Sequence, residues 1–65
     1  EKNKMNNAHI EQLKQLVKVT YDGDVIGKDI RDDLVRKLLA QRAHGYNWLT
    51  QKGVEYLVNL KILVP

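Results

Sequence analysis

The chain has 65 residues, of which 43% are hydrophobic and 29% are charged, and its formal net charge is +3. These values are typical of one small globular domain and exclude a disordered chain. The chain has no cysteine, which excludes disulfides and thiolate metal sites and fits a reducing, cytoplasmic setting. Without disulfides or a metal site, the stability of such a small core depends on regular packing or on a dimer partner.

No apolar run reaches the length of a membrane-spanning helix, and the polar N-terminus lacks the apolar segment of a signal peptide. We therefore expect a cytoplasmic protein with no membrane partner. Residues 1–7 are expected to form a disordered tail, and residues 8–65 a single domain. The chain is trimmed, cut from a longer protein, or preceded by added residues ahead of a natural start at Met5, and the sequence leaves these alternatives open.

The first segment, residues 8–18, is predicted to be an amphipathic helix with Asn7 as its N-cap. Its apolar residues recur at spacings of three and four, with polar residues between them. These apolar residues are Ile10, Leu13, Leu16 and Val17.

The next segment, residues 19–26, contains the turn signal Asp22-Gly23 between β-branched residues. It can form a tight hairpin. It can also form the end of the first helix, a turn, and one short strand at Val25-Ile26. We prefer the second arrangement, because the first helix can continue to Thr20 or Tyr21.

Residues 28–40 are predicted to form the second helix, capped by Gly27 or Asp29. Its apolar stripe is formed by Ile30, Leu34 and Leu38, with Val35 beside it. Acidic residues in the first turns and basic residues towards the end complement the helix dipole. They are Asp29, Asp32, Asp33, Arg36 and Lys37.

A hairpin is predicted from the alternating residues 39–43 and 46–49, with Gly45 supplying a positive φ in the turn. Thr50 is expected to cap a last helix over residues 51–60, whose first turn Gly53 weakens by up to ~1 kcal/mol. The apolar residues 62–64 are expected to add a strand or to pack under the core.

No constellation of residues indicates an enzyme. His9 is expected to be an exposed helix residue and His44 a turn residue, and neither has a second ligand at zinc spacing. The sequence contains no nucleophile motif and no glycine-rich phosphate loop. The Asp22–Asp24 segment lacks the later ligands of a calcium loop. We expect no catalytic residue, no metal, no cofactor and no small-molecule substrate.

Basic residues between Lys28 and Lys52 provide a possible nucleic-acid surface. Lys28, Arg31 and Asp32 are expected to share an exposed side of the second helix. Arg42 and His44 lie near the tip of the predicted hairpin, where arginine can contact phosphates or guanine. An ordinary solvated helix face explains the same charges, and the three aspartates of this helix oppose phosphate.

Tyr46 and Trp48 are one residue apart, so on a strand their side chains point to the same side. Such a pair packs in the core or half-core, or it contacts a partner or stacks on a base. Val35 and Leu39 flank the helix stripe and leave an apolar strip that favours a dimer or a protein partner.

Two runs of residues carry a family resemblance: DGDVIGKDIRDDLV from Asp22 to Val35, and HGYNWLTQKG from His44 to Gly53. With the order helix, strand, helix, hairpin, helix, they make the chain similar to a compact winged helix of the α+β class. The Leu-Thr-x-Lys-Gly phrase is common where the wing enters the last helix of such domains. The stretch also resembles small phage and prophage proteins thought to be winged helices.

The resemblance covers roughly residues 20–60 and departs from the family in one respect. A full winged helix has two helices between the first strand and the wing, but only residues 27–40 separate them here. Either the first helix of the pair is reduced to a turn around Ile26–Asp29, or the fold is a different small α+β domain.

The resemblance implies a reading helix and a wing that contact double-stranded DNA. The groove-facing residues of the helix would be Lys28, Arg31, Asp32 and Val35. The wing contacts would be Arg42, His44 and Asn47.

We expect a non-catalytic binding domain. The first hypothesis is a DNA-binding winged helix of a phage- or prophage-type regulator. The alternative is a protein-interaction module on the same fold, acting in dimerisation or in binding a host factor. The acidic cluster of the second helix and the residues Val35, Tyr46 and Trp48 favour this alternative.

Overall fold

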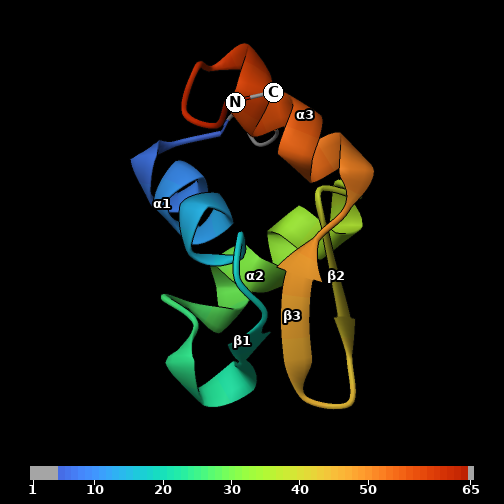
Figure 1. Cartoon of the computed structure of the whole chain (residues 1–65). Coiled ribbons are helices and arrows are strands. Elements are labelled where there is room, and N and C mark those ends of the chain that lie inside the picture. Colours follow the sequence, from blue (N-terminus) through green and yellow to red (C-terminus); the bar gives the residue numbers. More distant parts are fainter. Residues whose placement is uncertain (1–4, 65) are drawn as a thin grey trace.

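Helices alternate with short strands along residues 5–64, the part of the chain that the computed structural model describes (Figure 1). The strands form one antiparallel sheet in the order β1-β3-β2. This confirms a small α+β domain and is compatible with a winged-helix layout. The elements are α1 (Asn7–Gln15), β1 (Thr20–Tyr21), the 3-10 turn η1 (Asp22–Asp24), α2 (Lys28–Arg36), β2 (Ala40–Ala43), β3 (Tyr46–Leu49) and α3 (Gln51–Asn59).

Helix α1 begins one residue earlier than predicted. The side chain of Asn6, not Asn7, caps it by accepting a hydrogen bond from the backbone N–H of His9 at 3.1 Å. The helix ends at Gln15, three residues before the predicted Lys18. Residues 5–7 therefore belong to the domain instead of a tail, and Met5 packs against the core. The rest of the expected tail, residues 1–4, lies outside the described residues.

The prediction of a strand at Val25-Ile26 is wrong, because these residues form no strand. Strand β1 lies five residues earlier, where Thr20 pairs with Asn47 and Tyr21 with Tyr46 of β3. The Asp-Gly turn is the 3-10 turn η1, so neither a local hairpin nor a continued α1 occupies residues 19–26. The backbone N–H of Ile26 donates to Gln12 Oε1 of α1 at 2.8 Å, which attaches this segment to a helix instead of a strand.

Helix α2 is capped by Gly27, one of the two predicted caps, and ends at Arg36 instead of Ala40. Leu38 has a φ of +66° and ends the helix in a Schellman motif. In this motif the N–H of Leu38 donates to Val35 and the N–H of Leu39 donates to Leu34, both at 3.0 Å. Leu38 therefore leaves the apolar stripe in which we placed it and is 65% exposed.

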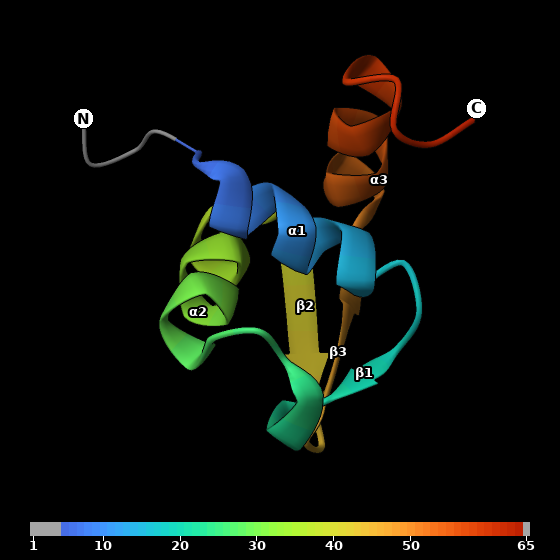
Figure 2. The ribbon, with the colours of Figure 1, turned by 90° about the vertical axis from the view of Figure 1, so that its left-hand side faces the viewer.

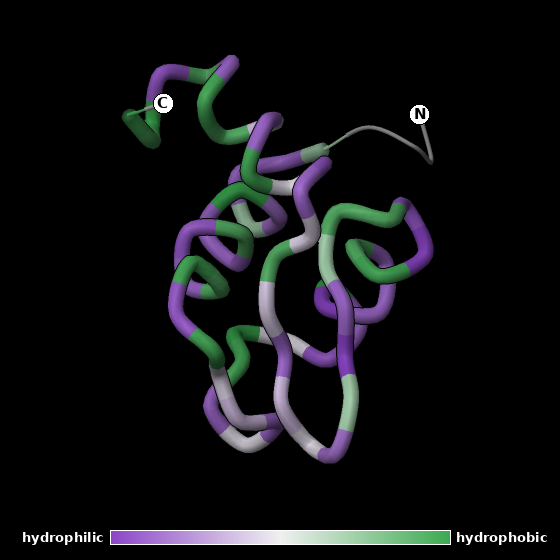
Figure 3. The backbone as a smooth tube through the Cα atoms, turned by 45° about the vertical axis from the view of Figure 1, so that its right-hand side comes forward, coloured by the Kyte–Doolittle hydropathy of each residue, from purple (hydrophilic) through white to green (hydrophobic). Residues whose placement is uncertain are grey.

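The structure confirms the predicted hairpin, which is formed by β2 and β3. Ala40 pairs with Leu49 and Ala43 with Tyr46, and Gly45 has the expected positive φ of +82°. Figure 3 shows that strongly hydrophobic residues gather in the helices and in the segment after α3, whereas the hairpin is mostly hydrophilic or near neutral. Its apolar surface therefore comes mainly from its aromatic side chains.

The core lies between the helices and one face of the sheet. Helices α1 and α2 lie on the same side of the sheet, and α3 rises from the end of β3 (Figure 2). Leu63 packs against the core, while Ile62 and Val64 are exposed and add no strand to the described sheet. The buried apolar residues are Leu13, Leu16, Leu34, Leu39, Ala40 and Leu57.

Thr50 and Gly53 join α3 to the end of α2. Thr50 caps α3 as predicted, because its Oγ1 accepts from the N–H of Gly53 at 3.1 Å. The same hydroxyl donates to the carbonyl of Leu38 at 2.6 Å. A Cβ on Gly53 would overlap the carbonyl oxygen of Leu39 and lie 3.2 Å from Leu49 Cδ2. Gly53, which we expected only to weaken the helix, therefore permits the close approach of α3 to the start of β2.

We predict that Gly53→Ala lowers the free energy of unfolding by about 2 to 3 kcal/mol, because the new methyl group overpacks a backbone contact. Helix propensity alone predicts the opposite, a gain of up to ~1 kcal/mol. Urea unfolding followed by circular dichroism measures the difference. The control is Gly23→Ala, whose Cβ would meet only the Tyr21 ring at 3.4 Å. An unchanged or raised stability of Gly53→Ala would contradict the close approach.

Candidate functional site

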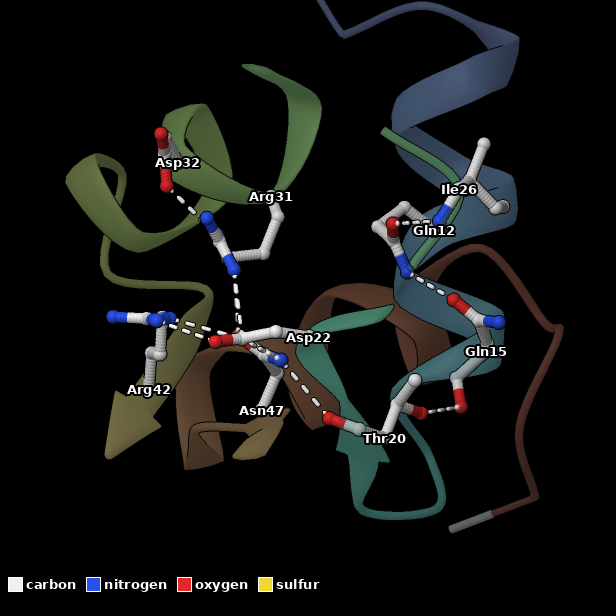
Figure 4. A network of polar contacts seen from close by, with 9 residues as sticks. All are labelled: Gln12, Gln15, Thr20, Asp22, Ile26, Arg31, Asp32, Arg42 and Asn47. Atoms are coloured by element: carbon white, nitrogen blue, oxygen red, sulfur yellow. Dashed lines mark hydrogen bonds and ion pairs between the residues drawn. The ribbon is translucent and has the colours of Figure 1, made fainter. Parts of the chain in front are cut away.

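The carboxylate of Asp22, at the start of η1, is the centre of a polar network (Figure 4). Its Oδ1 accepts hydrogen bonds from Arg31 Nη1 at 2.9 Å, Arg42 Nε at 3.0 Å and Asn47 Nδ2 at 2.9 Å. Its Oδ2 accepts from Nη2 of Arg42. One carboxylate thus joins η1 to α2, β2 and β3.

The sheet register explains how these groups meet. Arg42 and Asn47 are directly opposite each other on β2 and β3, so their side chains leave the same, inner face of the sheet. Asn47 is completely buried, and its Nδ2 also donates to the carbonyl of Thr20 at 2.9 Å. Arg31 is 6% exposed, and its Nε donates to Asp32 Oδ1 at 2.7 Å. A buried guanidinium of this kind needs such partners to offset its loss of hydration.

The structure places five of the seven predicted nucleic-acid contacts in internal interactions, among them Asp32 through its ion pair with Arg31. Arg31 does not share an exposed side with Lys28, as we expected, because it turns inward to Asp22. Asn47 is buried on the inner face of the hairpin, and Val35 is half-buried against the core. The guanidinium of Arg42 is half-exposed but is paired with Asp22. Leu39 is buried too, so the apolar strip predicted from Val35 and Leu39 is not open.

The remaining predicted contacts, Lys28 and His44, are exposed, as is Asp32 outside its ion pair with Arg31. On the exposed side of α2, Lys28 and Arg36 are accompanied by Asp29 and Asp32. Two basic and two acidic groups leave this helix face without a net positive charge. The face does not have the single-sign field that attracts a phosphate backbone.

A second ion cluster forms around Asp33. His9 Nε2 lies 2.8 Å and Lys37 Nζ 3.0 Å from its Oδ2, and Arg36 Nη1 lies 3.6 Å from its Oδ1. His9 is therefore a buried residue between α1 and α2, not the exposed helix residue that we predicted. The hydrogen bonds from Lys37 and then His9 lower the pKa of Asp33 below its ordinary value.

The outer face of the sheet carries three of the four aromatic residues of the chain. Tyr21 and Tyr46, paired across β1 and β3, meet edge to face with ring centroids 5.6 Å apart and are 55% and 48% exposed. Trp48 follows Tyr46 on the same side of β3 and is half-buried. Val19, just before β1, is 63% exposed. We call Val19, Tyr21, Tyr46 and Trp48 the aromatic face.

Sequence reasoning found Tyr46 and Trp48 but missed Tyr21, because it placed the first strand at Val25-Ile26. It also missed Asp22, whose Asp-Gly pair indicates only a local turn. The partners of Asp22 are 9, 20 and 25 residues away in sequence. No local pattern could have identified them.

Residues 5–64 contain no cluster of three or more acidic, histidine or cysteine side chains that could hold a metal ion. In the same residues no helix is both long and apolar enough to span a membrane. No family model, no curated protein and no solved structure matches the chain.

We predict that the domain loses stability as the pH falls below about 4, because its carboxylates bind protons less readily when folded. The hydrogen bonds from Arg42 and then Asn47 hold the pKa of Asp22 well below the ordinary 3.8. Above pH 3.8 this stabilisation is fully present, and it is lost as Asp22 becomes protonated below it. Thermal melting between about pH 2 and pH 7 measures the loss.

The variant Asp22→Asn removes the titrating group from the network. We expect it to melt at a lower temperature near neutral pH and to lose less further stability in acid than the wild type does. Asp24→Asn, an exposed residue of the same turn, is the matched control and should follow the wild-type profile. Parallel profiles for wild type and Asp22→Asn would show that Asp22 does not carry the effect.

Proposed function

We propose that this domain is a non-catalytic binding module that recognises a protein partner through its aromatic face. The exposed, edge-to-face pair of Tyr21 and Tyr46 beside Trp48 carries this proposal. Aromatic residues are enriched at the centres of protein interfaces, where they combine a large apolar area with a hydroxyl or N–H group.

The first partner to test is a second copy of the chain. Within residues 5–64 the buried apolar core consists of six residues, and a domain of this size buries a modest share of its surface. Two copies packed through their aromatic faces would gain a second apolar layer between sheets about 10 Å apart. The hairpin supplies few other apolar groups, so the aromatic side chains would form most of that layer.

The element order supports the finer proposal that the domain is a compact winged helix in which η1 replaces the first helix of the usual pair. In this interpretation the reduced element lies at Asp22–Asp24, ahead of the Ile26–Asp29 turn expected from the sequence. A cytoplasmic phage- or prophage-type protein remains part of the same proposal.

A second candidate function is binding of double-stranded DNA. The element order favours it, as do Lys28 and Arg36 on the exposed side of α2 and His44 at the hairpin turn. Arg31, Arg42 and Asn47 contribute less than expected from the sequence, because their polar groups bind Asp22. Asp29 and Asp32 further oppose phosphates, so we place DNA second.

For the protein-binding proposal we predict that the wild type self-associates with a Kd of about 10 µM or tighter, as an interface of roughly 1,000 Å² can provide. Tyr46→Glu should weaken self-association at least tenfold, because it places a charge in the apolar contact. Ile26→Glu is the matched control, since Ile26 is equally exposed but contacts α1 on the other side of the sheet. Sedimentation equilibrium measures both, and a monomer at about 1 mM would rule out self-association.

For the DNA proposal we predict salt-dependent binding to duplex DNA at low ionic strength. Lys28→Glu should weaken binding and reduce the slope of log K against log salt by about 1. Lys61→Glu, after the end of α3, should leave the slope unchanged. Fluorescence anisotropy with a labelled duplex measures this, and the absence of any titration at low salt would eliminate the DNA proposal.

A further inference from the structure

A shallow, open surface cavity of about 370 Å³ lies where the residue before the N-cap of α1 meets the end of α2 and helix α3. This volume falls within the range of sites for small organic ligands. None of its lining residues belongs to the aromatic face or to the hairpin turn, so the cavity is distinct from both proposed binding surfaces. Its walls are formed by Met5, Lys37, Leu39, Lys52 and Tyr56.

The floor of the cavity is apolar. Leu39 is 5% exposed and belongs to the core, and Met5 and Tyr56 are partly buried side chains that pack against that core. A thioether, an isobutyl group and a phenol ring can together bury one hydrocarbon chain or ring. Met5, Leu39 and Tyr56 can therefore contact the apolar part of a ligand.

The rim of the cavity is basic. Lys37 is the C-cap of α2, and its Nζ lies 3.0 Å from Asp33 Oδ2. Lys52 Nζ donates to the backbone carbonyl of Lys37 at 3.4 Å, and within residues 5–64 no carboxylate lies within 4 Å of it. Among the described residues, the Lys52 ammonium therefore has a weak neutral partner and no charged partner.

Lys52 also stands in the first turn of α3, where no acidic residue is present. A positive charge at this end of a helix is opposed by the helix dipole, and an acidic residue would be favoured there. At the neighbouring end of α2, Asp33 is the single carboxylate shared by His9, Arg36 and Lys37. The two charged residues that line the cavity, Lys37 and Lys52, are both basic, and a bound anion would balance the charge of Lys52.

We propose that this cavity binds a small organic anion, namely a carboxylate attached to one apolar chain or ring. The apolar group lies on Met5, Leu39 and Tyr56, and the carboxylate accepts hydrogen bonds from the ammonium groups of Lys52 and Lys37. The anion is proposed as a ligand and not as a substrate. This site is independent of the protein-binding and DNA-binding proposals.

The test uses 4-phenylbutyrate as the probe, with two analogues that each lack one half of it. Titration of the ¹⁵N-labelled full chain should shift the backbone amide signals of Lys37, Leu39, Lys52 and Tyr56, with a Kd of about 1 mM or tighter. Butyrate, which lacks the ring, and 4-phenylbutan-1-ol, which lacks the charge, should each bind at least tenfold more weakly. Equal binding of the alcohol would overturn the role of the lysines.

The variant Lys52→Met keeps the aliphatic stem and removes the charge, and it should weaken 4-phenylbutyrate binding about tenfold. Lys18→Met, at an exposed lysine after α1, is the matched control and should bind as the wild type does. Amide spectra and melting curves of both variants establish that they are folded. No shift at the four cavity residues, or equal binding by Lys52→Met, would overturn the proposal, whatever the outcome of the self-association and DNA experiments.

Discussion

The rest of the structure depends on the Asp22 carboxylate and its two arginines. The segment between β1 and α2 has little apolar anchorage, because Ile26 is exposed and η1 has no buried residue. Polar contacts hold this segment in place instead. Asp22 joins the turn to α2, β2 and β3, while Gln12 of α1 holds the N–H of Ile26. A network whose members satisfy one another orients its elements more sharply than a few apolar contacts can.

The same network determines what remains on the surface. Arg31, Arg42 and Asn47 are residue types that read nucleic acids, and the sequence allows them to point outward. Their engagement by Asp22 leaves α2 with balanced charges on its exposed side, whereas Lys52, at the start of α3, has no carboxylate within 4 Å among the described residues. The internal ion pairs thus separate the candidate surfaces into an aromatic sheet face, a neutral helix face and a basic cavity rim.

The parts of the fold that were predictable from the sequence carry local signals. Gly45 in the hairpin turn and Thr50 before α3 act on neighbours a few residues away, and both predictions are confirmed. Strand β1 was misplaced because its register is set by β3, about 25 residues later. Arg31 was misplaced because helical spacing gives its side of the helix but not the partner that covers it. Gly53 was misjudged because its importance lies in a contact with another element, not in helix propensity.

The helices and strands of residues 5–64 leave the aromatic face open. The domain measures 29 × 28 × 16 Å, and its shortest dimension accommodates one sheet and one layer of helices. Each α-helix has nine residues. Helices α1 and α2 cover the inner face of the sheet, where the core leucines lie. A third layer would add roughly 10 Å and needs residues that these elements do not provide. Within residues 5–64 no element covers the side chains on the outer face, so they tolerate water or are covered by a further segment or another molecule. Tyrosine and tryptophan, with a polar group on an apolar ring, are suited to both states.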